Sequence, residues 1–129
     1  MTAVDTNVLV RIVVNDDPAQ SARAAEFLRQ QDRVFLAKTV LLEVEWVLRS
    51  AYRLGRREIH AILRGILAMG SAEVEDEAAV VQAMRWYEEG MDFADSLHMA
   101  SAGPRRFVTF DAALQKRARR LGAGKIALL

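Results

Sequence analysis

The 129-residue chain contains no cysteine and only two histidines. Without cysteine it has no disulfide, no thiol nucleophile and no thiolate metal site, which fits a cytoplasmic protein. His60 and His98 are isolated and do not form a metal-binding pair; we expect His60 on a helix surface and His98 near a cleft. The chain also lacks a GxSxG nucleophile motif and a glycine-rich phosphate loop. These absences disfavour covalent hydrolases and phosphate-loop enzymes.

Long apolar runs and targeting signals are also missing. No apolar run approaches the ~20 residues needed to span a bilayer, so we expect no membrane contact. The N-terminus shows neither the basic segment nor the small-residue cleavage site of a secretion signal. There is no internal repeat and no linker rich in proline, glycine or serine. With 52% hydrophobic residues, the chain is expected to form a single soluble domain over residues 1–129.

Charge is nearly balanced, but arginine dominates the basic residues. The formal net charge is +1, and the 18 basic residues comprise 15 arginines and three lysines. Arginine suits bidentate contact with phosphate, but a GC-rich genome also produces an arginine excess. The basic clusters at 56–57, 105–106 and 115–120 are equally consistent with solvated faces.

Short apolar strands alternate with amphipathic helices along the chain, which predicts an α/β domain with a parallel sheet covered on both faces. Asp17 followed by Pro18 is a clear helix start, and Gly55 and Gly70 are each expected to end a helix. Residues 8–14 either begin a helix or continue the first strand. Strands are expected at 2–4, 33–37, 72–75, 106–110 and 125–129, and helices at 18–30, 38–55, 56–70, 76–90, 92–103 and 112–122.

Two aspartates follow predicted strands, where sites of parallel sheets lie. Asp5 stands between apolar runs, where an ionised carboxylate has a large free-energy cost unless it is paired. It is therefore either a cap or turn residue at the strand end, or one of several acids that share a cation. Asp111 presents the same alternatives, because it follows strand 106–110 and precedes the last helix.

Helix 38–55 carries two glutamates that are expected to differ in environment. Its apolar stripe is predicted at Val40, Val44, Val47 and Ala51. Glu43 lies at the edge of this stripe and is the candidate functional residue. Glu45 is expected on the surface, where it pairs with Arg49 one turn later.

Asp92 and Asp95 lie at the start of the predicted helix 92–103. Taken alone, they are best interpreted as a helix cap and a residue that favours the positive end of the helix dipole. The capping interpretation suits Asp92 better than Asp95, because a residue at the third helical position points back toward the strand ends.

Several carboxylates in one place require a compensating cation, because like charges at short range raise one another's pKa and oppose folding. Mg²⁺ and Mn²⁺ prefer oxygen ligands and retain several waters. Such ions activate water and stabilise phosphoryl displacement. A metal-dependent phosphodiesterase is thus the chemistry that the residues favour.

Four segments in order, "VDTNVLVR", "LLEVEWVLRS", "DFADSLHMA" and "VTFDAAL", resemble the PIN-domain ribonucleases, most closely the VapC toxins of toxin–antitoxin pairs. The resemblance extends over nearly the whole chain. It implies a PIN-like three-layer α/β/α fold, with a parallel sheet of four to five strands in the order 3-2-1-4-5. It also implies a Mg²⁺-dependent endoribonuclease, with Mn²⁺ as an alternative ion. Ala112 and Ala113 depart from the pattern, since relatives often have a charged pair there.

The resemblance also assigns roles to individual residues. The residues that match its catalytic and metal-binding acids are Asp5, Glu43, Asp95 and the more variable Asp111. The residues expected to support them are Thr6, Asn7, Asp92 and Thr109. The implied mechanism is in-line attack of a metal-activated water, which leaves a 5′-phosphate and a 3′-hydroxyl.

The partners implied by the resemblance are an RNA substrate, a VapB-like antitoxin and a second copy of the chain in a homodimer. Apolar residues of the first two helices could form the antitoxin groove or be ordinary core. A receiver domain is disfavoured, because no aspartate occurs between Asp32 and Asp76. Two alternatives stay open: a nucleic-acid-binding module without catalysis, and a DNA-directed PIN protein that acts with a partner.

Overall fold

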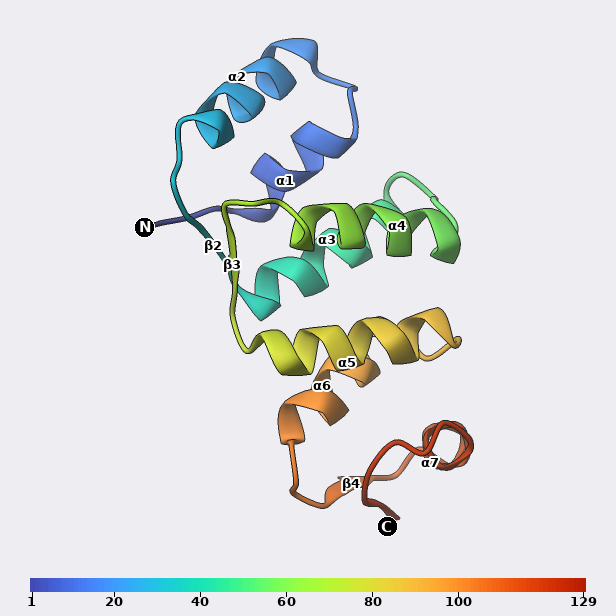
Figure 1. Ribbon diagram of the computed structural model, residues 1–129. Helices are drawn as coiled ribbons and strands as arrows, with labels where there is room; N and C mark the ends of the chain where they lie inside the picture. The colour runs from blue at the N-terminus through green and yellow to red at the C-terminus, as the bar shows by residue number, and fades with distance from the viewer. The chain divides into compact units, whose positions relative to one another are not determined.

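The computed structural model describes all residues 1–129 and divides into two compact units, Met1–Glu75 and Asp76–Leu129 (Figure 1). Each unit combines helices with parallel strands. The first unit contains β1 (Thr2–Ala3), α1 (Thr6–Val13), α2 (Pro18–Arg29), β2 (Val34–Leu36), α3 (Lys38–Ser50), α4 (Arg56–Leu67) and β3 (Ala72–Val74). The second contains α5 (Glu77–Glu88), α6 (Phe93–Ala102), β4 (Phe107–Thr109), α7 (Ala112–Arg120) and β5 (Ile126–Leu128).

The first unit is built on a three-stranded parallel sheet in the order β1-β2-β3. Val34 of the central strand pairs with Thr2 on one side and with Ala72 on the other. Val34 and Leu36 are fully buried, as expected for the middle strand of a covered parallel sheet. The helices contribute the rest of the core of this unit, chiefly Leu9, Val10, Leu41, Val44, Leu48, Ile59 and Leu63.

The second unit joins a helix pair to a two-stranded parallel sheet. Strands β4 and β5 pair from Phe107 opposite Ile126 to Thr109 opposite Leu128. Helices α5 and α6 pack closely, and the rings of Tyr87 and Phe93 meet edge to face with centroids 5.1 Å apart. A second cluster of buried residues lies under α7: Met91, Met99, Leu114, Ala118 and Ala123.

The α/β class and the parallel strands are confirmed, and so is most of the predicted strand order. The neighbours 3-2-1 occur in the first unit and the neighbours 4-5 in the second. The structure contains them as two sheets of three and two strands. The adjacency of β1 and β4 stays a prediction, as does the single-domain organisation of residues 1–129.

One open assignment is settled, and several helix boundaries differ from expectation. Residues 8–14 take the helical alternative, because residues 8–13 belong to helix α1, which begins at Thr6. Gly55 does not end α3 but forms the N-cap of α4, because α3 already stops at Ser50. Arg53 adopts a left-handed backbone with φ of 55°, which reverses the chain before Gly55. Helix α4 likewise ends at Leu67, before Gly70.

The buried face of α3 is rotated by about one residue from the predicted stripe. The buried residues are Leu41, Val44, Glu45 and Leu48. Two leucines bury more apolar surface than Val40 and Ala51 would, so they determine which face turns inward. The surface prediction for Glu45 was therefore wrong: it is 2% exposed. Its predicted pairing is confirmed, because Arg49 Nε donates to Glu45 Oε2 at 3.0 Å.

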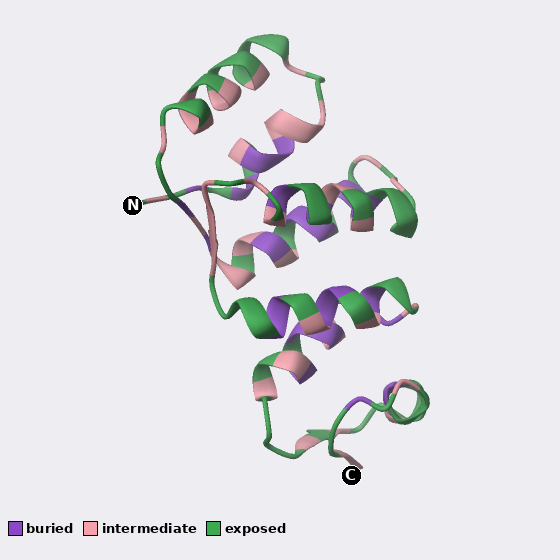
Figure 2. Ribbon diagram, viewed as in Figure 1, coloured by how far each residue is buried: buried purple, intermediate pink, exposed green.

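Helix α2 differs from the other helices of the first unit because it has no buried residue. Figure 2 shows exposed and intermediate positions along its whole length. The predicted start is confirmed: Asp17 is the N-cap, its carboxylate accepts from Gln20 N, and Pro18 is the first helical residue. None of the helices is both long enough and apolar enough to cross a bilayer.

Candidate functional site

Asp5 lies where β1 passes into α1. Val4, just before it, is buried, whereas the Asp5 side chain is exposed. Asp5 is the N-cap of α1, and its Oδ1 accepts a hydrogen bond from the Thr6 amide at 2.8 Å. The capping role considered from the sequence is thus present, and it fixes a carboxylate at the carboxyl end of a strand of the sheet.

Thr6 connects Asp5 to Glu43. Its side chain is only 3% exposed, and its hydroxyl donates to Glu43 Oε1 across the α1–α3 contact. Glu43 itself is exposed, so it is the hydrogen bond from Thr6 that restricts its carboxylate. The first unit therefore brings together two of the four predicted acids. Asn7, the next predicted supporting residue, is also exposed.

The other two predicted acids lie in the second unit, each at a helix start. Asp92 is the N-cap of α6 and accepts from the Asp95 amide at 3.0 Å. Asp111 is the N-cap of α7 and accepts from the Leu114 amide at 3.0 Å. The Asp111 amide donates to Thr109 Oγ1 at 3.0 Å. Thr109 thus helps to fix the backbone that carries Asp111.

These acids line one cavity of about 220 Å³, which we call the acid pocket. Its lining residues are Met91, Asp92, Asp95, Asp111, Ala113, Leu114 and Arg117. Asp95 is half-buried in it, whereas Asp92 and Asp111 are exposed. The second unit therefore brings Asp92, Asp95 and Asp111 to one cavity.

Arg117 in this pocket was not singled out by the sequence analysis. Its guanidinium donates to the Gly90 carbonyl, and it forms no ion pair with the acids beside it. Six residues separate it from Asp111, which places the two on different faces of α7 at about 100° per residue. No helical spacing could have identified it, because its position depends on how α7 packs against residues 90–92.

Burial and neighbouring charges shift the pKa of Asp95. Burial raises the pKa of Asp95, and the negative charges of Asp92 and Asp111 raise it further, while His98 lowers it. Since the folded-state pKa lies above the ordinary value, the ionised carboxylate is disfavoured in the fold. Asp95 therefore contributes stability at acid pH that is lost as the pH rises through its raised pKa. A bound cation would relieve this cost.

Asp92→Asn is expected to lower the pKa of Asp95, because it removes a neighbouring negative charge while asparagine remains an equally good N-cap. A carboxyl-detected NMR titration of the metal-free protein measures this directly. Asp17→Asn, the same change at the N-cap of α2, is the control, since Asp17 does not contribute to the Asp95 shift. An unchanged pKa of Asp95 in Asp92→Asn would show that the charge of Asp92 does not contribute to the shift.

The chemical type of the predicted ligands suits a hard divalent ion. All four predicted ligands are carboxylates, the oxygen donors that Mg²⁺ and Mn²⁺ favour. The two units each hold part of this set, and the structure contains no group of three or more His, Asp or Glu side chains arranged to hold a metal. The predicted residues are therefore of the right chemical kind, with Asp5 and Glu43 in the first unit and Asp95 and Asp111 in the second.

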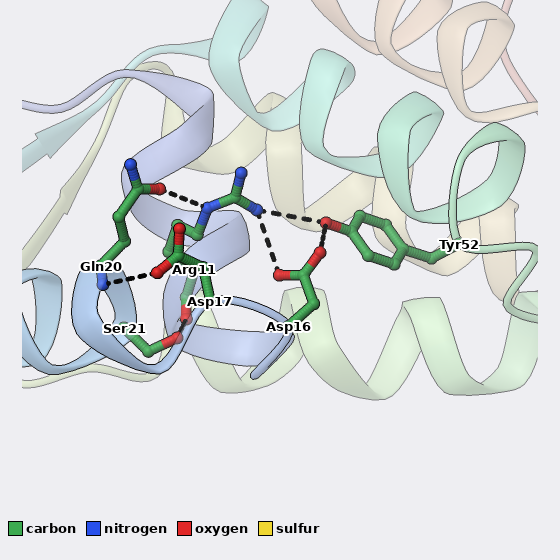
Figure 3. A network of polar contacts seen from close by, with 6 residues as sticks. All are labelled: Arg11, Asp16, Asp17, Gln20, Ser21 and Tyr52. Carbon is green, nitrogen blue, oxygen red and sulfur yellow. Dashed lines mark hydrogen bonds and ion pairs between the residues drawn. The ribbon is translucent and has the colours of Figure 1, made fainter.

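A polar network ties α1, α2 and the chain after α3 together (Figure 3). The Arg11 guanidinium donates to Gln20 Oε1 at 2.6 Å, to Asp16 Oδ1 at 3.2 Å and to the Tyr52 hydroxyl at 3.2 Å. The Tyr52 hydroxyl donates to Asp16 Oδ2 at 2.7 Å. Ser21 Oγ also donates to the Arg11 carbonyl. The network holds α2 against α1, and α2 has no buried residue of its own.

A groove of about 460 Å³ lies beside this network. It is lined by Asn7, Val8, Arg11, Gln20, Arg23, Ala24 and Phe27. The groove therefore combines two arginines with the apolar side chains of α1 and α2. Asn7 belongs to it and directly follows Thr6, so the groove adjoins the Asp5–Glu43 pair.

The resemblance makes Glu43 a metal ligand, and on that expectation Thr6→Val should lower the affinity for Mn²⁺ by about 10- to 100-fold, because Glu43 loses the donor that orients it. Valine keeps the shape of the buried side chain, so the fold remains. Thr6→Ser keeps the hydroxyl and is expected to restore function. Calorimetric titration with Mn²⁺ checks the prediction. Equal affinity in the wild type and in Thr6→Val would show that Thr6 does not support metal binding.

Comparison with known protein families assigns the chain to one of them. The family model for the PIN domain matches residues 2–120, and the chain therefore belongs to the PIN domain family. No curated protein matches the chain. The matched range contains all four predicted acids, and it covers most of each unit. PIN domains are typically metal-dependent nucleases, and many act in toxin–antitoxin systems.

Proposed function

We propose that the protein is a Mg²⁺-dependent endoribonuclease, with Mn²⁺ as an alternative ion, and the VapC-like toxin of a toxin–antitoxin pair. The observation that carries this proposal is the placement of the acids. Asp5 and Glu43 meet around Thr6 at the end of β1, and Asp95 and Asp111 share a cavity at the end of β4. Both pairs stand where parallel sheets of this class carry their sites.

The proposal requires one sheet in the order 3-2-1-4-5, and hence one domain over residues 1–129. The proposed metal ligands are Asp5, Glu43, Asp95 and Asp111, and all four lie in the range that the PIN family model matches.

Each acid has a distinct structural support in the proposed mechanism. The Thr6 amide holds Asp5 and the Thr6 hydroxyl holds Glu43, while Asp111 is held by the Leu114 amide. Asp95 keeps a half-buried carboxylate against the cavity wall. A divalent ion bound by these groups would polarise the scissile phosphodiester and lower the pKa of the attacking water.

Arg117 is the proposed contact for a substrate phosphate. It lines the acid pocket, is anchored by the Gly90 carbonyl and has no acidic partner. Arg117→Ala is expected to raise KM by about tenfold with a smaller change in kcat, because a charge-assisted hydrogen bond to phosphate is lost. Steady-state cleavage of a fluorogenic RNA measures both constants. Arg119→Ala, on the same helix but outside the pocket, is the control, and an equal effect of both variants would reject the assignment.

The proposed partners follow from the groove and from the family. A VapB-like antitoxin segment with apolar residues would fit the α1–α2 groove, whose lining includes Phe27 and Val8. We also propose that the protein forms a homodimer and acts in the cytoplasm. Copurification with a small protein that is encoded beside this one tests the antitoxin assignment. Sedimentation of the purified protein and of the complex tests the homodimer.

The test of the proposed activity is incubation of purified, antitoxin-free protein with total cellular RNA and Mg²⁺ or Mn²⁺. Discrete fragments that carry a 5′-phosphate are expected, and they should disappear in EDTA. Single-stranded DNA of matched sequence serves as the parallel substrate. Cleavage of DNA alone would indicate a DNA-directed enzyme, and binding of RNA without cleavage in any metal would indicate a non-catalytic module.

A further inference from the structure

The second unit has another cavity, which shares no residue with the acid pocket. Its volume is about 330 Å³. Its walls come from α5, the end of α6, the start of β4 and the turn that precedes β5. We call it the cationic pocket, and its functional groups are those of Trp86, Arg105, Phe107 and Lys125.

The charge of this cavity is entirely positive. Arg105 and Lys125 are its only charged lining residues, and no carboxylate lines it. Both side chains are exposed and neither forms an ion pair. Arg105 donates one hydrogen bond, at 3.2 Å, to the Ala102 carbonyl, which anchors its guanidinium. Two cations without a neutralising partner at one small cavity favour an anion, and guanidinium matches phosphate well.

The cavity also has an aromatic wall. Trp86 and Phe107 are both half-buried, and both pack against the buried cluster that contains Met99 and Ala123. The two rings are therefore held by the core while part of each remains at the cavity. Aromatic side chains beside cations form the recurring surface on which single nucleotides stack.

The turn before β5 contains two glycines with a left-handed backbone. Gly122 and Gly124 have φ of 67° and 63°, and no atom lies within 4 Å of where either Cβ would be. Glycine is required here by the left-handed backbone, and it leaves the main chain open at the cavity. A ligand can therefore approach the turn closely.

We propose that the cationic pocket binds one nucleotide, with its phosphate at Arg105 and Lys125 and its base against Trp86 and Phe107. The volume is at the lower end of the range of about 300–1,000 Å³ typical of small-ligand sites. The pocket lies at the amino ends of β4 and β5, whereas Asp111 follows the carboxyl end of β4. The site is thus separate from the acids and does not depend on the proposed nuclease activity.

Trp86 fluorescence tests the proposal in the full chain. Trp46→Phe removes the other tryptophan, which is 57% exposed on α3, and leaves Trp86 as the only reporter. Titration with 5′-AMP in EDTA is expected to give saturable quenching, with adenosine and inorganic phosphate binding at least about tenfold more weakly. EDTA keeps the acids without metal, so the result does not depend on whether the protein cleaves RNA.

A matched pair of double variants separates this site from general charge attraction. Arg105→Ala with Lys125→Ala is expected to weaken 5′-AMP at least about tenfold, since both phosphate contacts are removed. Arg106→Ala with Lys116→Ala removes the same charge outside the pocket and should leave affinity unchanged. All four side chains are exposed, so thermal unfolding should show intact folds.

Absence of saturable quenching, equal weakening by the two double variants, or equal binding of 5′-AMP and phosphate would each overturn the proposal. Competition by a glutamate-rich peptide as effective as 5′-AMP would also overturn it, because the site would then recognise acidic protein. A short oligoadenylate shows whether the bound nucleotide is free or part of an RNA strand. Tighter binding than 5′-AMP assigns the pocket to an RNA strand, and equal binding assigns it to the free nucleotide.

Discussion

Asp95→Asn should reduce RNA cleavage by about 10²–10³-fold, because Asp95 is a proposed metal ligand and its loss would remove several kcal/mol of transition-state stabilisation. The same change should make the metal-free protein more stable at neutral pH. Ionised Asp95 is disfavoured by burial and by its acidic neighbours, and asparagine removes that charge. Activity and stability are thus expected to move in opposite directions. Single-turnover cleavage and thermal unfolding in EDTA measure the two effects.

Asp5→Asn is the counterpart from the first unit and should produce a loss of similar size. Asparagine is as good an N-cap as aspartate, so α1 should remain intact. Asp17→Asn, at the N-cap of α2, controls for the loss of one capping carboxylate and should cleave like the wild type. If Asp95→Asn retained wild-type activity, or if the capping control lost as much as Asp5→Asn, these acids would not be catalytic.

Phe93→Ala should lower the free energy of unfolding by about 3–5 kcal/mol. Phe93 is 1% exposed and packs edge to face on Tyr87, so its ring joins α6 to α5. It also lies between Asp92 and Asp95 in the sequence. Loss of the ring should therefore loosen the helix start that holds both acids. Chemical denaturation monitored by circular dichroism measures this decrease in the free energy of unfolding.

Phe110→Ala is the matched control, because it makes the same substitution at a ring that is 81% exposed. Its effect on stability should stay within about 0.5 kcal/mol. Phe93→Leu keeps much of the apolar volume and should recover part of the lost stability. Equal destabilisation by Phe93→Ala and Phe110→Ala would contradict the packing described for α5 and α6.

Local chemistry made much of the fold predictable. Asp17, Asp92 and Asp111 cap helices in the structure as their sequence contexts predict, because a cap depends on a few adjacent residues. Gly55 was assigned to the wrong helix end, since a glycine between two helices fits either end. The face of α3 was also misplaced. Periodicity alone does not weigh Leu41 and Leu48 against smaller residues one position away.

The candidate site was predictable only in part. The motifs singled out the four acids, and the structure holds Asp5 and Glu43 at Thr6 and places Asp95 and Asp111 in one cavity. Arg117 and the cationic pocket were not predicted, because both arise from tertiary packing of segments distant in sequence. Whether the two pairs share an ion depends on strand adjacency between the units, which no local pattern determines.

Binding of Mn²⁺, measured by the electron paramagnetic resonance of the free ion, tests the central claim most directly. If acids of both units hold one ion, then Asp5→Asn and Asp95→Asn should each weaken the same tight site by at least about tenfold. Asp17→Asn should bind like the wild type. If Asp5→Asn left the affinity unchanged while Asp95→Asn lost it, the ion would belong to the second unit alone, and the shared site would be contradicted.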